Sequence, residues 1–135
     1  MDYLEYLKNN HNISLNPQQE QAVLTINGAI LLLAVPGSGK TTVIITRLGN
    51  MIFNYAIPPE NILNITFSRA SARDMKHRFS KIFGNSLDDR LEFRTIHSFC
   101  LMVLKDYYQT NNMEIPKIIE DNFILIKKIY IGLKK

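Results

Sequence analysis

Residues 34–42 read AVPGSGKTT, and this glycine-rich stretch continues the apolar run 29–34. Glycines let a backbone bend through conformations closed to other residues, so that several N–H groups can point at one anion. A lysine at the end of such a loop brings its ammonium to the β- and γ-phosphates, and the hydroxyl that follows binds Mg²⁺. The stretch therefore predicts a nucleotide site with Lys40 and Thr41 as catalytic residues and Thr41 as the Mg²⁺ ligand. Its candidate nucleotide-contacting residues are Pro36, Gly37, Ser38, Gly39, Lys40, Thr41 and Thr42.

The loop alone leaves the class of nucleotide-binding protein open. It matches G-x-x-x-x-G-K-[ST] except at the first position, which is Ala34. A GTPase would carry N-K-x-D, but the sequence has no Asn-Lys pair. A small-molecule kinase would carry an arginine-rich lid, whereas the basic cluster here falls in a predicted helix. Motor-type ATPases remain, so ATP and Mg²⁺ are the expected cofactors. The alternative is a plain glycine-rich turn with Lys40 in solvent.

The composition predicts a soluble globular protein and mildly favours a polyanionic partner. The chain has 135 residues, 46% of them hydrophobic, which suffices for one core. Its net charge is +4, and basic residues gather between 69 and 94, while the first 39 residues carry only Lys8. No apolar run reaches the roughly 18 residues of a membrane span, and the polar N-terminus is unlike a signal peptide. We therefore expect a cytoplasmic protein without a membrane partner, and a buried, inert Cys100.

Hydrophobic periodicity and turn residues predict alternating helices and strands. Strands are expected at 29–34, 62–67 and 92–95, the first of them apolar throughout, as in a strand buried on both faces of a parallel sheet. Helices are expected at 2–10, 17–25, 40–54, 69–83, 96–108 and 120–133, with loops at 84–90 and 110–116. Asn16 and Pro17 supply a cap and a first helical residue. The alternation predicts an α/β layered domain with right-handed crossovers.

Three further stretches, together with the glycine loop, resemble the motifs of UvrD/Rep-type superfamily 1 DNA helicases. LNPQQEQAV (15–23) is similar to the family's Q motif, and the resemblance implies that Gln19 reads the adenine edge, to which an amide offers both a donor and an acceptor. ITFSRASARDMKHR (65–78) resembles motif Ia, and FRTIHSFC (93–100) resembles motif Ib. The motifs follow the family's order and spacing. The family often has an arginine where this chain has Thr42.

Motifs Ia and Ib imply a path for single-stranded DNA. Aromatic and cationic side chains next to each other suit a single DNA strand whose bases are splayed out and stacked on the aromatic rings. From the residues alone, a core Phe67, a solvated Arg69 and a capping or core His97 are the simpler interpretations, as is a solvated Gln19. No histidine has companions at metal-ligand spacing. The DNA-contacting residues that the resemblance implies are Phe67, Ser68, Arg69, Thr95, Ile96 and His97.

The resemblance also implies an incomplete P-loop NTPase domain of the RecA-like type, with three layers around a parallel sheet. This domain would occupy residues 1–108, and residues 109–135 would start an inserted helical subdomain. The whole protein would be an ATP-dependent DNA helicase acting on single-stranded DNA or a single/double-strand junction. Hydrolysis needs an Asp-Glu pair at a strand end and arginines from a second RecA-like domain. Neither Asp88-Asp89 nor Glu120-Asp121 follows an apolar strand, so these 135 residues alone are expected to be inactive.

A self-standing nucleotide-binding module with a regulatory or structural role stays open beside the helicase interpretation. An apolar strand ending in Asp-Glu, encoded beyond Lys135, would decide between the two. Both a UvrD-like helicase and a RecB/AddA-like nuclease–helicase fit the motifs.

Overall fold

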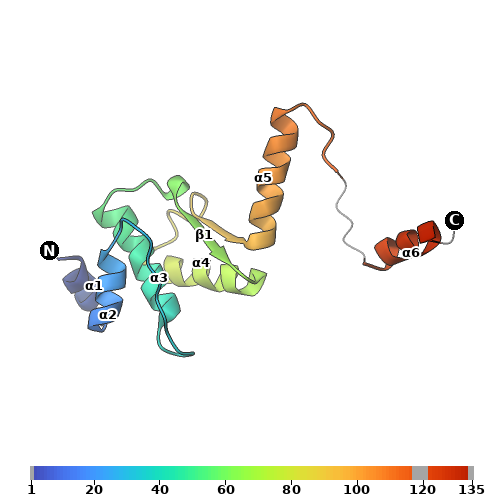
Figure 1. Cartoon of the computed structure of the whole chain (residues 1–135). Coiled ribbons are helices and arrows are strands. Elements are labelled where there is room, and N and C mark those ends of the chain that lie inside the picture. The colour runs from blue at the N-terminus through green and yellow to red at the C-terminus, as the bar shows by residue number, and fades with distance from the viewer. Residues whose placement is uncertain (1, 117–121, 134–135) are drawn as a thin grey trace. The chain divides into compact units, whose positions relative to one another are not determined.

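The chain folds into two compact units, which a computed structural model describes for residues 2–116 and 122–133. The first unit, Met1–Phe99, holds the glycine-rich loop 34–42, which is named the phosphate loop after its predicted role (Figure 1). Its elements are α1 (Tyr3–His11), α2 (Pro17–Leu24), α3 (Lys40–Gly49), the π-helical turn η1 (Asn50–Asn54), the 3₁₀ turn η2 (Pro59–Asn61), β1 (Leu63–Thr66), α4 (Arg69–Phe83) and β2 (Glu92–Thr95). Helix α5 (Ile96–Thr110) continues into the second unit, Cys100–Lys135, which also holds α6 (Asn122–Leu133). The predicted helices are confirmed, except that the last five residues of 40–54 form the π-helical turn η1. The expected start of the last helix at Glu120 lies outside the described residues.

Local hydrogen bonds explain where α2 and α4 begin. The Asn16 side chain accepts from the backbone N–H of Gln19, and the Gln19 side chain accepts from the backbone N–H of Asn16, both at 2.9 Å. This reciprocal capping box satisfies two donors that the helix itself leaves without partners. Ser68 caps α4, because its hydroxyl accepts from the backbone N–H of Ser71 at 3.1 Å. The predicted cap at Asn16 is therefore confirmed.

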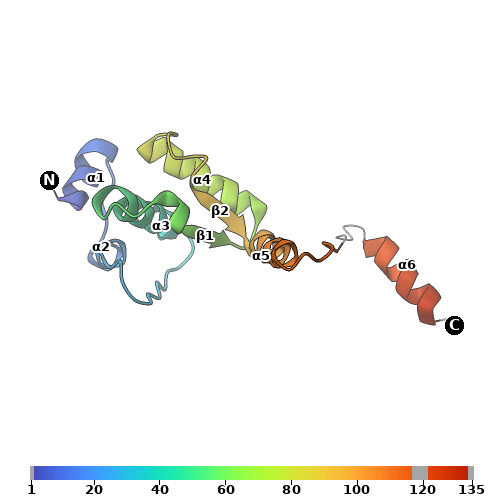
Figure 2. The same cartoon turned by 90° about the horizontal axis from the view of Figure 1, so that it is seen from above.

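Strands β1 and β2 form a parallel pair. Their register aligns Leu63 with Glu92 and Thr66 with Thr95, so both strands end at the same edge. Helix α4 connects the strands and packs on both, and α3 lies between α2 and α4 (Figures 1 and 2). Two of the three predicted strands are thus confirmed, and the fold is consistent with the α/β class. The three-layer RecA-like arrangement and the domain division after residue 108 stay predictions.

The third predicted strand, 29–34, is wrong, because this segment has no strand structure. Leu31 and Leu33 are 82% and 84% exposed, whereas burial on both faces would hide them. A strand forms only where a neighbour takes up its N–H and C=O groups, and neither β1 nor β2 pairs with this segment. The apolar pattern indicates what the segment can bury, but the described residues offer it no partner strand.

Two apolar clusters anchor α3 from opposite sides. In one cluster, Ile45 and Leu48 pack against Phe79 of α4. In the other, Leu7 of α1 and Val23 of α2 pack against the same helix. Each of these five side chains is at most 2% exposed, and burying a side chain of this size contributes about 1.5–3 kcal/mol. The phosphate loop therefore leads into a helix with a fixed position.

In the second unit, Cys100 is a free cysteine with an exposed side chain. The expectation of a buried thiol is therefore wrong: apolar neighbours in sequence place a residue on a helix, but they do not decide which side of the helix is covered. Among the residues that the structure describes, no helix has both the length and the apolar character to cross a membrane.

Candidate nucleotide site and DNA interface

The phosphate loop has the backbone that its glycines predict. Gly37 and Gly39 have φ angles of 81° and 84°, a region that other residues rarely enter. Gly39 also precedes the first residue of α3, and no side chain caps this helix. Among the residues that the structure describes, no side chain accepts from the N–H groups of residues 40–42, which lie at the end of the helix where the dipole favours an anion. This geometry fits a phosphate group.

Lys40 folds back onto the loop that precedes it. Its ammonium donates to the carbonyl oxygen of Val35 at 2.7 Å and to that of Ala34 at 3.2 Å. The hydroxyl of Ser38 donates to the same Val35 carbonyl at 2.8 Å. Lys40 is exposed and Thr41 is half-buried, so both polar groups can reach solvent. A phosphate could replace the two carbonyls as the partner of the Lys40 ammonium.

Gln19 lies directly against this loop. Its Nε2 donates to the carbonyl oxygen of Ser38 at 3.0 Å, and a Cβ added at Gly39 would lie 3.4 Å from the same nitrogen. The interpretation of Gln19 as a merely solvated helix residue is therefore wrong. Its carboxamide stands next to the phosphate loop with a donor and an acceptor, which suits an edge of a nucleobase. The adenine contact itself stays a prediction.

A groove of about 420 Å³ separates the start of α2 from the loop. Gln19 and Lys40 supply polar groups to it, and Leu32, Leu33 and Val43 supply apolar walls. Apolar walls with a few placed polar groups are typical of ligand sites. The groove suits a ligand that combines a flat ring with an anionic group.

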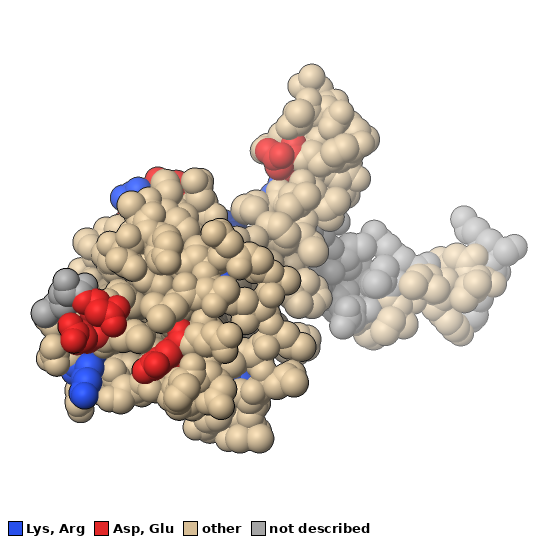
Figure 3. Space-filling model, turned by 60° about the vertical axis from the view of Figure 1, so that its left-hand side comes forward, with Lys and Arg blue, Asp and Glu red and all other residues tan. Residues whose placement is uncertain are grey.

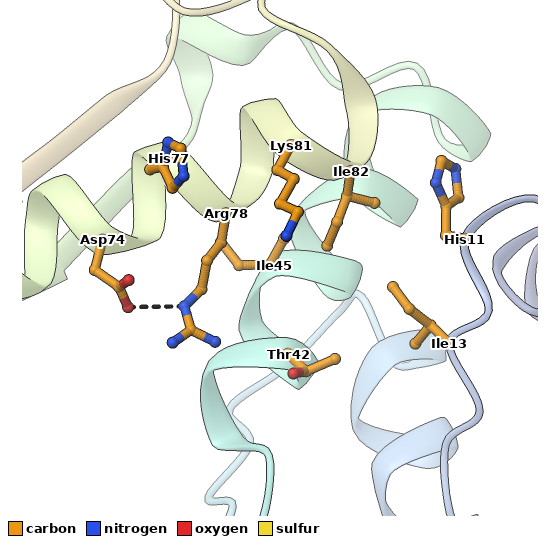
Figure 4. Close-up of a pocket in the computed structure, with 9 residues that line it drawn as sticks. All are labelled: His11, Ile13, Thr42, Ile45, Asp74, His77, Arg78, Lys81 and Ile82. Carbon is orange, nitrogen blue, oxygen red and sulfur yellow. Dashed lines mark hydrogen bonds and ion pairs between the residues drawn. The ribbon is translucent and has the colours of Figure 1, made fainter.

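Thr42 does not line this groove. It faces a second hollow, of about 560 Å³, between α3, α4 and the segment after α1 (Figure 4). Arg78 of α4 extends its guanidinium toward Thr42, while its Nε donates to the Asp74 carboxylate at 2.8 Å. The terminal nitrogens of Arg78 have no hydrogen-bond partner among the described residues. The sequence does not indicate a role for Arg78, because only its pairing with Asp74 one turn earlier is readable from spacing.

The sheet brings the two predicted DNA-contacting motifs together. Because Thr66 pairs with Thr95 at the ends of parallel strands, residues 67–69 and 96–97 leave the sheet at the same edge. Phe67 is 85% exposed, so its interpretation as a core residue is wrong. Arg69 is exposed beside it, which fits a solvated arginine as well as a phosphate contact.

Thr95 and His97 have different environments in this part of the chain. Thr95 is only 9% exposed, and its hydroxyl accepts from the backbone N–H of Ser98 at 3.1 Å. The Ser98 hydroxyl accepts in turn from the backbone N–H of Thr95 at 3.0 Å, so Thr95 caps α5. Ile96 and His97 are exposed in the first turn of that helix, so His97 is neither its cap nor a core residue. The structure thus favours Ile96 and His97 over Thr95 as surface contacts.

Charged side chains are unevenly distributed over the first unit. Figure 3 shows a face of mainly uncharged side chains, on which a few acidic side chains lie next to a basic one. Helix α4, in contrast, carries only Asp74 as an acidic residue. In the part of the chain that the structure describes, no cluster of histidine, cysteine or carboxylate side chains could hold a metal ion by itself. The basic side chains of α4 are Arg69, Arg73, Lys76, Arg78 and Lys81.

Comparison with known families matches residues 15–130 to the UvrD/REP helicase N-terminal domain. The chain belongs to this family, and the resemblance to UvrD/Rep-type helicases is confirmed.

Individual relatives agree with the family assignment. ATP-dependent DNA helicase PcrA of Bacillus subtilis (strain 168) is 40% identical over 102 residues, covering 76% of this chain and 14% of the relative. A probable DNA helicase II homolog of Rickettsia felis is 36% identical over 100 residues, or 74% and 15% of the two chains. PcrA of Staphylococcus aureus (strain Mu50) is 36% identical over 91 residues, or 67% and 12%. The chain therefore spans a small part of the length of these relatives.

Proposed function

We propose that this chain is the ATP-binding part of an ATP-dependent DNA helicase that moves along single-stranded DNA and unwinds duplex. The observation that most supports this proposal is the hydrogen bond from Gln19 to Ser38. This bond places an amide that suits a base edge next to the glycine loop that contains Lys40 and Thr41. The chain that carries both features belongs to the UvrD/REP family. Relatives named as ATP-dependent DNA helicases support the same reaction.

Lys40, Thr41 and Gln19 have separate roles in the proposed nucleotide site, and Lys40 and Gln19 line the groove between α2 and the loop. The Lys40 ammonium and the first N–H groups of α3 bind the β- and γ-phosphates, and the Thr41 hydroxyl holds Mg²⁺, which supplies charge neutralisation at the phosphates. The Gln19 amide exchanges its bonds to the Ser38 carbonyl and to the Asn16 backbone N–H for bonds to the adenine edge. Related helicases often carry an arginine at the position of Thr42. Here Arg78 supplies a positive charge next to Thr42, in the hollow of about 560 Å³ that both residues line.

The DNA interface follows the edge at which β1 and β2 end. Phe67 offers a stacking face to a splayed base, and Arg69 offers a charge to a phosphate. Residues 95–97 lie on the neighbouring strand end, where Ile96 and His97 are exposed. A second RecA-like domain and the remainder of the helicase would supply the catalytic carboxylate and arginines that hydrolysis needs. Such an enzyme would work in the cytoplasm.

Isothermal titration calorimetry with Mg²⁺-ATP tests the proposal. Lys40→Ala should weaken binding roughly 30-fold or more, because it removes a charge-assisted contact to phosphate. Lys8→Ala removes the same charge from an exposed position of α1 and should leave the affinity unchanged. Equal affinity of the wild type and Lys40→Ala would contradict the assignment.

The role of Arg78 has its own pair of variants. Arg78→Met keeps the apolar stem and removes the guanidinium that points toward Thr42. We expect it to weaken Mg²⁺-ATP binding several-fold. Arg73→Met makes the same exchange at an exposed position of α4 and should have no effect. Identical titrations for the two variants would remove Arg78 from the site.

A further inference from the structure

We propose that Asn50 and Arg47 are positioning residues of the nucleotide site, which hold α2 against α3 and thereby keep Gln19 at the phosphate loop. This inference rests on the proposed function. It assigns part of the selectivity for the base to two side chains that do not line the groove between α2 and the loop.

Both side chains bind carbonyl groups at the end of α2. The Nδ2 of the fully buried Asn50 donates to the carbonyl oxygen of Val23 at 3.0 Å. The Arg47 guanidinium donates to the carbonyl oxygen of Ala22 at 2.5 Å and to that of Ile26, just beyond the helix, at 3.3 Å. The last carbonyls of a helix have no partner within it, and a positive charge is favourable there. Two residues of α3 and η1 therefore cap α2.

The anchored end of α2 and Gln19 move together. Helix α2 has eight residues, and Gln19 and Val23 are one turn apart on the same side of it. A displacement at Val23 is therefore transmitted to Gln19, whose Nε2 bonds to Ser38. Apolar packing of Val23 opposes separation of the helices, but it is non-directional and restrains sliding and rotation poorly. Directional hydrogen bonds from Asn50 and Arg47 restrain both motions.

The π-helical turn η1 fixes Asn50 in its turn. The Nδ2 of Asn54 donates to the Oδ1 of Asn50 at 3.1 Å, and the backbone N–H of Tyr55 donates to the Asn50 carbonyl at 3.1 Å. With its oxygen held by Asn54, the amide of Asn50 points its nitrogen at Val23. Single π-helical turns are frequent next to functional sites, and here the turn sets the direction of one buried amide.

Two measurements on the 135-residue chain test this inference. Asn50→Leu keeps the approximate volume and removes the hydrogen bond to Val23, so it should lower the preference for Mg²⁺-ATP over Mg²⁺-GTP roughly threefold or more. In the nucleotide-free chain, the NMR signal of the Gln19 side-chain amide should move toward that of a solvated glutamine. Asn54→Ala removes the bond that orients the Asn50 amide but leaves the bond to Val23, and should shift both readouts in the same direction by less than Asn50→Leu does.

A double substitution separates positioning from general destabilisation. In a Gln19→Ala background, Asn50→Leu should cause no further loss of selectivity, because both changes act through the same side chain. Additive losses would overturn the inference, and so would wild-type selectivity with an unchanged Gln19 signal in Asn50→Leu. If Asn50→Leu does not fold, Arg47→Met takes its place with the same expectations. A wild-type chain that does not bind Mg²⁺-ATP contradicts the proposed function itself, whereas one that binds ATP and GTP equally overturns only the present inference.

Discussion

The ammonium of Lys40 donates to the carbonyl oxygen of Val35 at 2.7 Å, so the loop that suits phosphate is closed by its own lysine. Lys40 and Val35 are both exposed, and hydrogen bonds that compete with water contribute little to stability. A phosphate offers the ammonium a charge-assisted partner, which two neutral carbonyls do not. Exchange of one partner for the other therefore costs little, and the closed loop is compatible with nucleotide binding.

Because these hydrogen bonds are exposed, we predict that the Lys40 ammonium contributes to nucleotide binding and not to the stability of the fold. Lys40→Ala should change the free energy of unfolding by less than about 0.5 kcal/mol, because the bonds that it removes are exposed to solvent. Urea unfolding followed by circular dichroism measures this change at pH 7. A loss of more than about 1 kcal/mol would mean that the ammonium holds the loop in shape, and that lost nucleotide binding in this variant has a structural cause.

Local patterns in the sequence predicted most of the fold. Asn16 with Pro17 and the glycines of the loop determine backbone geometry within a few residues, and the helices begin where these residues indicate. The segment 29–34 was predicted wrongly, since a strand depends on a neighbour far away in the sequence. The same reason explains why the anchoring of α2 by Arg47 and Asn50 could not be predicted.

Some residues of the candidate sites can also be predicted from local sequence, whereas others depend on contacts between distant segments. Gly37, Gly39 and Lys40 form a motif whose spacing is typical of phosphate binding, so the sequence alone predicts them as site residues. The contact of Gln19 with Ser38 joins residues 19 positions apart and required the packed structure. The exposure of Phe67 reversed the simpler interpretation, because an aromatic residue after a strand is usually a core residue.

Gly49 has no room for a side chain. A Cβ at this position would lie 2.6 Å from the Tyr3 hydroxyl and 2.7 Å from Cε2 of Phe83. Gly49→Ala should therefore destabilise the first unit by about 1–3 kcal/mol, despite the roughly 1 kcal/mol by which alanine favours a helix. Gly132→Ala is the matched control, because α6 offers it the same propensity and no atom of the described residues lies within 4 Å of the new Cβ. Urea midpoints that rise in both variants would refute the clash.

The buried phenol of Tyr3 predicts that the free energy of unfolding falls at alkaline pH. Tyr3 is 6% exposed, and its hydroxyl donates to the carbonyl oxygen of Thr46 at 2.7 Å. Burial, and then the neighbouring Tyr6, raise the pKa of Tyr3 well above its usual range. Above pH 10 the unfolded chain releases this proton and the folded chain keeps it, so stability falls as pH rises. The contribution of Tyr3 is fully present below about pH 10 and disappears toward the folded-state pKa.

Tyr3→Phe isolates this contribution. At pH 8 it should lower the free energy of unfolding by about 1 kcal/mol, because it removes the buried hydrogen bond from the Tyr3 hydroxyl to the Thr46 carbonyl. Between pH 10 and pH 11 the variant should lose less stability than the wild type. Tyr107→Phe removes an exposed phenol and should keep the pH dependence of the wild type. Parallel pH profiles for Tyr3→Phe and the wild type would contradict the assignment.

Phe67 and Arg69 predict a weak, salt-dependent interaction with single-stranded DNA. Phe67→Ala should reduce the affinity for an unstructured oligonucleotide by about 1–3 kcal/mol, the range for one stacked base, without loss of stability. Arg69→Ala should reduce the log–log salt slope by about 0.7, the value for one phosphate contact. Fluorescence anisotropy at low salt measures both effects, with Lys81→Ala at the far end of α4 as the control for charge. Unchanged binding in both variants would leave Phe67 and Arg69 as plain surface residues.

The 135 residues should have no ATPase activity of their own, with or without DNA, although the phosphate loop is formed. Asp88 lies in the turn after α4, where its carboxylate accepts from the Ser80 hydroxyl at 2.6 Å, so it is not placed at a strand end to activate water. Arginine fingers alone contribute roughly 10³ to 10⁵ in rate, and these would come from another domain. Phosphate release by the purified chain should therefore be the same in the wild type and in Lys40→Ala. A DNA-stimulated rate that Lys40→Ala abolishes would place a catalytic carboxylate among these residues, with Glu120 and Asp121 as the first to substitute.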